Sequence, residues 1–279
     1  MKQPLITIII AVYNAEGTIQ QCIDSIVNQT YKNKEIIIID GASSDNTVAL
    51  LRKNAAHLSY WVSEPDSGVY NAFNKGLKHA SGEWIYFLGA DDYFWNDCVL
   101  EEVVKRLMTT PANIKIAYGC VMLVNDKNEN ILQLGKPWNE TKKIFSQLMN
   151  IPHQGVMHRR SLFEIHGVFD ESFKITGDYE MLLRELKTND ALFIDNSIIA
   201  GYRQGGISSV SANALRVNSE YRRAQKLNGL NFPGLMWISN QIKIYTYLFL
   251  FKLVNEKNAK KMLDLTRKIR KLPPYWEKL

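Results

Sequence analysis

The chain has 279 residues, of which 46% are hydrophobic and 22% are charged. This balance is typical of a globular protein with a sizeable core, and it excludes the disordered, collagen-like and coiled-coil classes. The net charge of +6 is unevenly distributed, because residues 241–279 hold ten Lys or Arg against three acids. The first 240 residues are therefore close to neutral, and the end of the chain is basic.

The three cysteines, Cys22, Cys98 and Cys120, are widely spaced and odd in number. This argues against a disulfide framework or a cysteine-based zinc site and fits a reducing compartment such as the cytoplasm. We expect all three to be small buried side chains. The first apolar run, residues 5–12, is too short for a signal-peptide core or a membrane span and is typical of a buried strand.

Apolar strands alternate with amphipathic helices over the first 120 residues, which predicts a doubly wound, mostly parallel α/β sheet. The strands are expected at residues 5–12, 35–39 and 84–88, and the helices at about 18–27, 46–53 and 99–108. The strands are apolar throughout, as strands covered on both faces should be. Thr18 is expected to cap the first helix and Asp45 the second.

The pattern changes after residue 113. Short strands between residues 114 and 134 predict a small antiparallel hairpin. The next stretch is mixed, with a helix near residues 179–186, and the remainder of the chain is expected to be helical. We therefore predict a catalytic domain over residues 1–215 and a helical, basic C-terminal extension over residues 216–279.

Three of the expected strands end in polar residues, at 13–14, at Asp40 and at Asp91 and Asp92. In open α/β sheets, ligands bind beyond the carboxyl ends of the strands. No glycine-rich phosphate loop follows any of these strands, so a bound phosphate needs another source of positive charge. Adjacent carboxylates repel one another unless a cation such as Mg²⁺ or Mn²⁺ neutralises them. A surface turn with a helix cap is the alternative for the Asp pair.

Four motifs follow one another along the chain: residues 4–14 (PLITIIIAVYN), 39–47 (IDGASSDNT), 64–76 (EPDSGVYNAFNKG) and 82–92 (GEWIYFLGADD). In this order they resemble the motifs of the family-2 glycosyltransferases. With shorter matches further on, the resemblance covers residues 4 to about 210. It implies the GT-A fold, a nucleotide-diphosphate sugar as donor, Mn²⁺ or Mg²⁺ as cofactor, and transfer with inversion at the anomeric carbon.

The same resemblance places the donor site at the strand ends and on the 64–76 segment. The residues that it implies there are Ala11, Tyr13, Asn14, Asp40, Asp66, Lys75 and Asp91. Tyr13 and the backbone beside it would pack on the base, Asp40 would hydrogen-bond to the base or ribose, and Asp91 would lie near the ribose or sugar. From local sequence alone, Asp40 and Asp66 are also typical turn formers.

Three further residues take roles in the reaction by resemblance. Asp92 would be the direct metal ligand, Asp178 occupies the place of the general base, and His153 lies near the acceptor. Inverting transfer needs a base for the acceptor proton and an electrophile for the departing diphosphate, which a metal supplies. Locally, Asp178 also suits a helix cap and His153 a structural role. Many relatives have acids where this chain has Gly89 and Gly177.

The basic end of the chain joins an apolar, aromatic stretch at residues 242–253 to a run of Lys and Arg. Basic residues beside an apolar helical face favour an anionic membrane surface. A helix that packs on the catalytic domain and exposes its basic face to water is the alternative. The eight uncharged residues between Lys243 and Lys252 are too few to span a membrane. We expect no nucleic-acid partner, because no module for one is recognised.

We therefore predict an inverting, metal-dependent, non-processive glycosyltransferase that moves a hexosyl or N-acetylhexosaminyl group. The favoured donor is a UDP-sugar, and the acceptor is a hydroxyl of a lipid-linked or cell-surface glycan, as in O-antigen or capsule synthesis. We expect it in the cytoplasm or peripherally on the inner face of the cell membrane. The alternatives are an inactive nucleotide- or glycan-binding protein of the same fold and a sugar-nucleotide pyrophosphorylase. The latter should carry a glycine-rich loop after its first strand, which this chain lacks.

Overall fold

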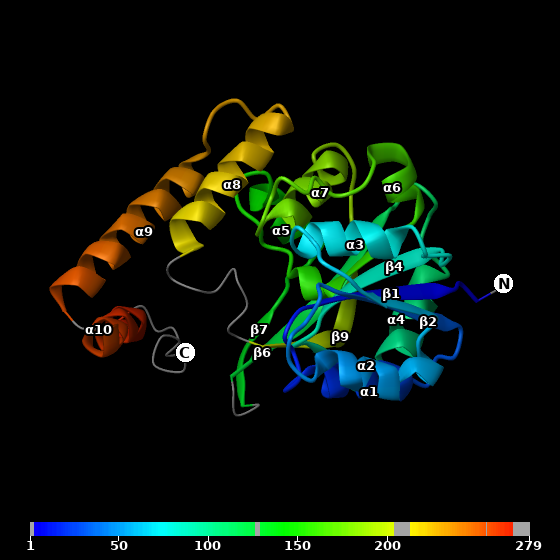
Figure 1. The fold of residues 1–279 in the computed structure, drawn as a ribbon. Coiled ribbons are helices and arrows are strands. Elements are labelled where there is room, and N and C mark those ends of the chain that lie inside the picture. The colour runs from blue at the N-terminus through cyan, green and yellow to red at the C-terminus, as the bar shows by residue number, and fades with distance from the viewer. Residues whose placement is uncertain (1–2, 126–128, 204–212, 255, 270–279) are drawn as a thin grey trace.

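The computed structural model describes residues 3–125, 129–203, 213–254 and 256–269. In this part of the chain a single mixed sheet is covered by helices on both faces, and a helical extension projects from one end (Figure 1). The strands are β1 (Ile6–Val12), β2 (Lys34–Asp40), β3 (Tyr60–Ser63), β4 (Trp84–Gly89), β5 (Tyr93–Phe94), β6 (Ile116–Val124), β7 (Asn130–Leu134), β8 (Val156–Arg159) and β9 (Leu192–Arg203).

The sheet order is β3-β2-β1-β4-β8-β6-β9-β5, with β7 paired to β6. The helices are α1 (Ile19–Val27), α2 (Thr47–Lys53), α3 (Val69–Leu77), α4 (Val99–Leu107), α5 (Trp138–Phe145), α6 (Ser161–His166), α7 (Gly177–Leu186), α8 (Ala214–Leu227), α9 (Leu235–Leu253) and α10 (Glu256–Ile269). Two short 3₁₀ turns, η1 (Ala55–His57) and η2 (His153–Gly155), complete the regular structure of the described residues.

The half of the sheet formed by β3, β2, β1 and β4 is parallel and confirms the doubly wound arrangement. Ala11 is in register with Gly89 of β4, Val12 with Asp40 of β2, and Asp40 in turn with Ser63 of β3. Neighbouring strands lie about 4.8 Å apart, so the carboxyl ends of β2 and β4 are separated by roughly 10 Å. This edge gathers the predicted donor-site residues.

The other half of the sheet is mixed. β8 runs antiparallel to β4 and β6, whereas β6 and β9 are parallel. The predicted hairpin is present as β6 and β7, and its turn at residues 126–128 lies outside the described residues. β3, β8 and β9 are strands that the sequence pattern did not predict.

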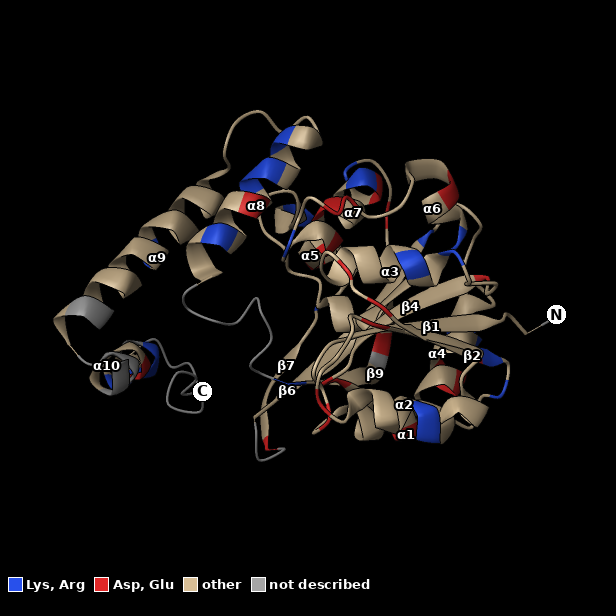
Figure 2. Cartoon of the chain, viewed as in Figure 1, with Lys and Arg blue, Asp and Glu red and all other residues tan. Residues whose placement is uncertain are grey.

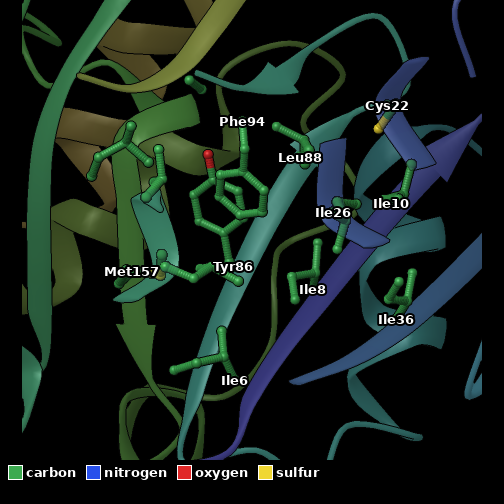
Figure 3. Packing of buried hydrophobic residues seen from close by; sticks show 14 of the residues in the cluster. Ile6, Ile8, Ile10, Cys22, Ile26, Ile36, Tyr86, Leu88, Phe94 and Met157 are labelled. Carbon is green, nitrogen blue, oxygen red and sulfur yellow. The ribbon is translucent and has the colours of Figure 1, made fainter. Parts of the chain in front are cut away.

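The core lies on both faces of the sheet, because alternate residues of a strand point to opposite faces. Ile8 and Ile10 pack on one face against α1 and α4, and Ile9 packs on the other against α3. Figure 3 shows the first face, where Tyr86 lies beside Phe94. The central strands are therefore covered on both sides, and they form a rigid platform for the loops at their ends.

Two local expectations are wrong. Cys22 and Cys120 are buried, but Cys98 is exposed, because it lies in the surface turn that leads into α4. Thr18 precedes α1 without a capping hydrogen bond from its side chain. A turn precedes this helix instead, and the carbonyl of Ala15 accepts the amides of Thr18 and Ile19. Asp45 does serve the start of α2, since its Oδ1 accepts the amide of Thr47 at 3.0 Å.

The C-terminal extension is a series of packed helices, with α8 on α7, α9 on α8 and α10 on α9 (Figure 1). The indole Nε1 of Trp237 in α9 donates to the carbonyl of Asn218 in α8 at 2.8 Å. Across the described ranges no helix is both long and apolar enough to cross a membrane. The boundary between residues 215 and 216 stays a prediction, and α8 begins beside it at Ala214.

Candidate active site

The loops that follow β1 and β2 are tied together by side-chain to backbone hydrogen bonds. Asn14, with a φ of +47°, donates its amide to Ser43 Oγ at 2.8 Å and accepts the amide of Ser44 on Oδ1 at 2.9 Å. Ala11, which is half-buried, ends the pairing of β1 with β4 just before this loop. Tyr13 is held at the same edge with 64% of its surface exposed. Its ring is therefore free to stack on a planar ligand such as a nucleotide base.

Asp40 is fully buried at the end of β2 and organises the neighbouring backbone. Its carboxylate accepts the amide of Ser43 at 3.0 Å, the hydroxyl of Ser43 at 2.5 Å and the hydroxyl of Ser63 at 2.6 Å. The structure thus shows Asp40 as a turn organiser beside the predicted base site. Its direct hydrogen bond to the base or ribose stays a prediction.

Asp66 lies over the loop that follows β2. A Cβ on Gly41 would come within 2.7 Å of Asp66 Oδ2, so a larger residue at that position would displace the Asp66 carboxylate. Asp66 Oδ1 accepts the amide of Gly68 at 2.8 Å. The structure therefore brings Asp66 to the same edge as Asp40, where the family resemblance places it.

Lys75 of α3 is engaged by the loop that carries Asp66. Its Nζ lies 2.7 Å from the carboxylate of Glu64 and donates to the carbonyl of Pro65 at 2.9 Å. These contacts place Lys75 as a brace for residues 64–66. Its predicted role in the donor site, toward the phosphates or the sugar, has no support from these contacts and stays a prediction.

Asp91 and Asp92, at the end of β4, point their carboxylates toward the same space. A Cβ on Gly89 would lie 2.7 Å from Asp91 Oδ1 and 2.7 Å from Asp92 Oδ2. Burial raises the pKa of the Asp92 carboxyl well above its usual range, and the charge of Asp91 raises it further. Burial also raises the pKa of Asp91, opposed by the charge of Arg203. The backbone amide of Arg203 donates to Asp92 Oδ1 at 3.0 Å.

This pair fits a divalent cation. Asp92 is buried and the adjacent Asp91 is half-buried, and a cation between the two carboxylates would favour their charged forms. Mg²⁺ and Mn²⁺ are commonly held by one or two carboxylates together with phosphate oxygens and water. Within the ranges that the structure describes, no group of three or more His, Cys, Asp or Glu side chains is arranged to hold a metal. Asp91 and Asp92 are the residues that would hold the ion.

Asp178 lies at the start of α7 and is half-buried. Its Oδ1 accepts the amide of Tyr179 at 2.8 Å and lies 3.3 Å from the hydroxyl of Tyr70. No described residue hydrogen-bonds to its Oδ2. The ring of Tyr70 also explains Gly177, because a Cβ there would lie 2.9 Å from the ring. Asp178 thus serves the helix start with one oxygen, and its role as general base stays a prediction.

His153, in η2, is packed among aromatic rings. Its ring lies 6.1 Å from Phe87 and 5.5 Å from His158, measured between centroids. Burial lowers the pKa of His153, opposed by the charge of Asp178, so the imidazole is neutral near pH 7. Its Nε2 makes no hydrogen bond to a described residue. The packing fits a structural role, and the acceptor-side role stays a prediction.

Tyr86 of β4 links the Asp91 and Asp92 end of the site to η2, which carries His153. The hydroxyl of Tyr86 donates to the carbonyl of Gln154, which follows His153. Burial raises the pKa of Tyr86 and the charge of Asp92 adds to it, while the charge of Asp178 acts on His153. The predicted metal ligands and the predicted base therefore border the same region of the sheet.

The sequence interpretation missed the contacts that hold the segment before Asp178. Glu171 accepts hydrogen bonds from the side-chain amides of Asn71 and Asn74, both at 2.8 Å. Lys174 Nζ donates to the carbonyl of Ser67 at 2.8 Å, and Glu220 of α8 accepts the backbone amides of residues 174–176. Nothing in the local sequence marks these residues, because their partners lie far away along the chain.

The sequence profile described as Glycosyl transferase family 2 matches residues 7–165. The chain belongs to this family. It is therefore an enzyme of the glycosyltransferase class, and the pyrophosphorylase alternative is set aside. A relative named PGL/p-HBAD biosynthesis glycosyltransferase, from Mycobacterium tuberculosis, is 29% identical over 215 residues, which cover 75% of this chain and 81% of the relative.

Solved structures confirm the GT-A fold. The chain is similar to Staphylococcus aureus TarS in complex with UDP-GlcNAc, with a TM-score of 0.66 and 18% identity over 95% of this chain and 77% of that one. It is also similar to a mannosyltransferase from Pyrobaculum calidifontis in complex with GDP-Man and Mn²⁺. There the TM-score is 0.64 and the identity 16%, over 99% of this chain and 84% of that one.

Proposed function

We propose that the protein transfers one sugar from a nucleotide-diphosphate sugar to a hydroxyl group, with inversion and with the help of Mn²⁺ or Mg²⁺. The observation that carries this proposal is the convergence of the Asp91 and Asp92 carboxylates over Gly89, at the sheet edge shared with Tyr13. UDP-GlcNAc in TarS and GDP-Man with Mn²⁺ in the mannosyltransferase support a nucleotide-sugar donor and a divalent cation. We favour a UDP-sugar that carries a hexosyl or N-acetylhexosaminyl group.

The reaction assigns separate tasks to the two ends of the site. Tyr13 stacks on the base. Asp92 would hold the metal together with Asp91, which is also expected near the ribose or sugar, and the bound metal would neutralise the diphosphate. Asp178 takes the proton of the acceptor hydroxyl with its free Oδ2. The acceptor oxygen then bonds to the anomeric carbon from the face opposite the diphosphate. The carbon–oxygen bond to the diphosphate breaks, and the diphosphate leaves with the electron pair.

Calorimetric titration with UDP, GDP, dTDP and CDP, each with Mn²⁺ and with EDTA, tests the donor assignment. We expect one of the four to bind selectively, and only in the presence of Mn²⁺. Selective binding of GDP would replace the UDP assignment and leave the metal assignment intact. An absence of binding to all four nucleotides under both conditions would contradict the proposal and favour an inactive protein of the same fold.

We also propose that the acceptor is lipid-linked or part of a cell-surface glycan such as O-antigen or capsule, and that the C-terminal extension binds the anionic inner face of the cell membrane. Most of the large hydrophobic side chains exposed in the described residues lie from Leu227 onward. Six of the seven along α9, all but Met236, are spaced by three and four residues: Leu235, Ile238, Ile242, Tyr245, Phe249 and Leu253. This spacing puts them in one stripe along the helix. Figure 2 shows that most of α9 carries no charge.

The charge of the extension favours a membrane over a second copy of the chain. Residues 241–279 hold ten cations against three acids. Lys243 on α9, which carries the apolar stripe, and Lys261 and Lys268 on α10 are exposed. Pairing of two such extensions would bring like charges together, whereas an anionic surface complements them. An apolar helical face with flanking cations lies in the plane of the membrane interface rather than across it.

Vesicle sedimentation tests this assignment. We expect the protein to sediment with phosphatidylcholine vesicles that contain phosphatidylglycerol, and less so at high salt, because salt screens the charges. Ile242→Ser combined with Phe249→Ser should abolish the binding. Ile165→Ser is the matched control, because Ile165 in α6 is 60% exposed and Ile242 is 62% exposed. A dimer in solution without vesicle binding would contradict the membrane assignment.

A further inference from the structure

Glu220 of α8 forms an unusual set of contacts with the segment just before α7. Its carboxylate accepts the backbone amide of Lys174 at 3.1 Å, that of Ile175 at 2.9 Å and that of Thr176 at 3.0 Å. The residue is buried, with its side chain 10% exposed. One carboxylate thus binds three consecutive amides, at a separation of 44 to 46 residues along the chain.

These hydrogen bonds are strong for three reasons. A charged acceptor makes shorter and stronger hydrogen bonds than a neutral one. The bonds lie in a partly buried place, where water competes poorly for the amides. The carboxylate also lies at the N-terminal end of α7, where a negative charge is favourable. Arg216, one turn earlier on α8, donates to the same carboxylate at 3.3 Å.

The segment that Glu220 holds leads directly into Gly177 and Asp178. The same segment also contacts α3, which follows the donor-site loop: the hydroxyl of Tyr70 donates to the carbonyl of Ile175 at 2.7 Å. Lys174 Nζ donates to the carbonyl of Ser67, next to Asp66. The backbone before Asp178 is therefore clamped between the donor-site loop and α8. Without the α8 contact, one side of this clamp is lost.

We propose that Glu220 is a positioning residue of the transfer reaction, which fixes the backbone at residues 174–176 and thereby the carboxylate of Asp178. The proposal rests on the proposed function, in which Asp178 is the general base. It also makes α8 a working part of the catalytic unit, although α8 lies beyond the residues that the family profile matches. Glu220 touches no substrate in this role.

Glu220→Gln separates positioning from binding, because glutamine keeps one acceptor oxygen and loses the charge and the second acceptor. Displacement of a catalytic group by about 1 Å costs up to 10²-fold in rate, so we expect kcat to fall on the order of 10-fold. The donor KM and the metal-dependent donor affinity should stay within about twofold, because the donor contacts are untouched. Glu220→Ala should lower kcat further.

The matched control is Glu185→Gln at the other end of α7. Glu185 is also buried and paired, with its side chain 1% exposed and bonded to His166 at 2.7 Å. We expect this variant to lose thermal stability without loss of kcat. Two outcomes would show that the positioning role is wrong. One is that Glu220→Gln and Glu185→Gln, compared at equal thermal stability, have the same kcat. The other is that Glu220→Gln lowers the donor affinity by as large a factor as it lowers kcat.

A double-mutant cycle with Asp178→Asn tests whether the effect passes through Asp178. We expect Glu220→Gln to lower kcat little further in the Asp178→Asn background. Asparagine cannot act as the base, so displacing it does not reduce the rate any more. Fully additive losses would overturn the positioning role alone. Normal turnover of Asp178→Asn by itself would overturn the base assignment of the proposed function, and the positioning role with it.

Discussion

The hydroxyl oxygen of Tyr70 lies 3.3 Å from Oδ1 of Asp178, although the two residues are 108 positions apart. Tyr70 belongs to α3, which follows the donor-site loop, and Asp178 begins α7. Burial raises the pKa of Tyr70 well above its usual value and the charge of Asp178 adds to it, so the hydroxyl keeps its proton. Tyr70 therefore connects the loop over the donor with the predicted base.

Tyr70→Phe removes this connection and keeps the ring that fills the space above Gly177. We expect kcat to fall several-fold, and the free energy of unfolding to fall by about 1 kcal/mol through the lost hydrogen bond to Ile175. Tyr31→Phe is the control, because Tyr31 also donates from a buried hydroxyl, to the carbonyl of Pro4, which precedes β1. Equal effects of the two substitutions on kcat, measured at saturating donor, would contradict the role of Tyr70.

Asp178→Asn should stop turnover and leave donor binding intact. Asparagine can still accept the amide of Tyr179 through its side-chain oxygen, so the start of α7 should form normally. Loss of a general base lowers the rate by about 10²- to 10⁴-fold. Steady-state rates and calorimetric titration of the same variant with the nucleotide and Mn²⁺ check both halves of this prediction. Near-normal turnover would show that another group takes the acceptor proton.

Asp92→Asn should abolish metal-dependent nucleotide binding and stabilise the metal-free protein. The substitution removes a metal ligand, and we expect metal-dependent nucleotide binding to be lost. A carboxyl whose pKa is raised by folding lowers stability as the pH rises above the usual carboxyl value near 4. Near pH 7 the metal-free variant should therefore melt at a higher temperature than the metal-free wild type. Thermal scans in EDTA measure this, and a lower melting temperature would mean that Asp92 is stabilised by contacts other than a metal.

The edge of the sheet that carries the donor-site residues was predictable from the sequence, because those residues follow directly after recognisable strands. The apolar runs that form β1, β2 and β4 can be recognised locally, and parallel pairing then aligns their ends. This is why Asp40 and Asp91 could be placed at one edge before the structure was known. The roles of single residues were less predictable. The ammonium group of Lys75, for example, could bind a phosphate or a carboxylate, and in the structure it contacts the carboxylate of Glu64.

The far half of the sheet and the support of Asp178 could not be predicted in the same way. β9 contains a polar interruption: Gly119 pairs with Ile194 and the next residue, Cys120, pairs with Ile198. Residues 195–197 of β9 have no partner in this register. They are polar residues typical of a turn, but in the structure they form an irregularity within the strand. Glu220 binds backbone amides, which every residue except proline carries, so no side-chain pattern marks its partners.

The buried histidines of the β4–β8 region should make the protein sensitive to acid. Burial lowers the pKa of His158 well below its usual value, and the nearby His153 lowers it further. As the pH falls below about 6.5, the unfolded chain takes up protons that the folded chain does not. Stability therefore falls by roughly 1.4 kcal/mol per pH unit for each histidine that stays neutral.

His158→Phe tests this prediction, because the site is lined by aromatic rings. The centroids of Phe87 and Phe163 lie 5.2 Å and 5.9 Å from that of His158, so a phenyl ring has suitable neighbours. The melting temperature of the wild type should drop between about pH 7 and pH 5, and the drop should be smaller in His158→Phe. His57→Phe, at an exposed position in η1, is the control. If both variants keep the wild-type slope of melting temperature against pH, the prediction is wrong. Protonation of His158 would then not destabilise the folded state, and carboxylates would determine the acid sensitivity.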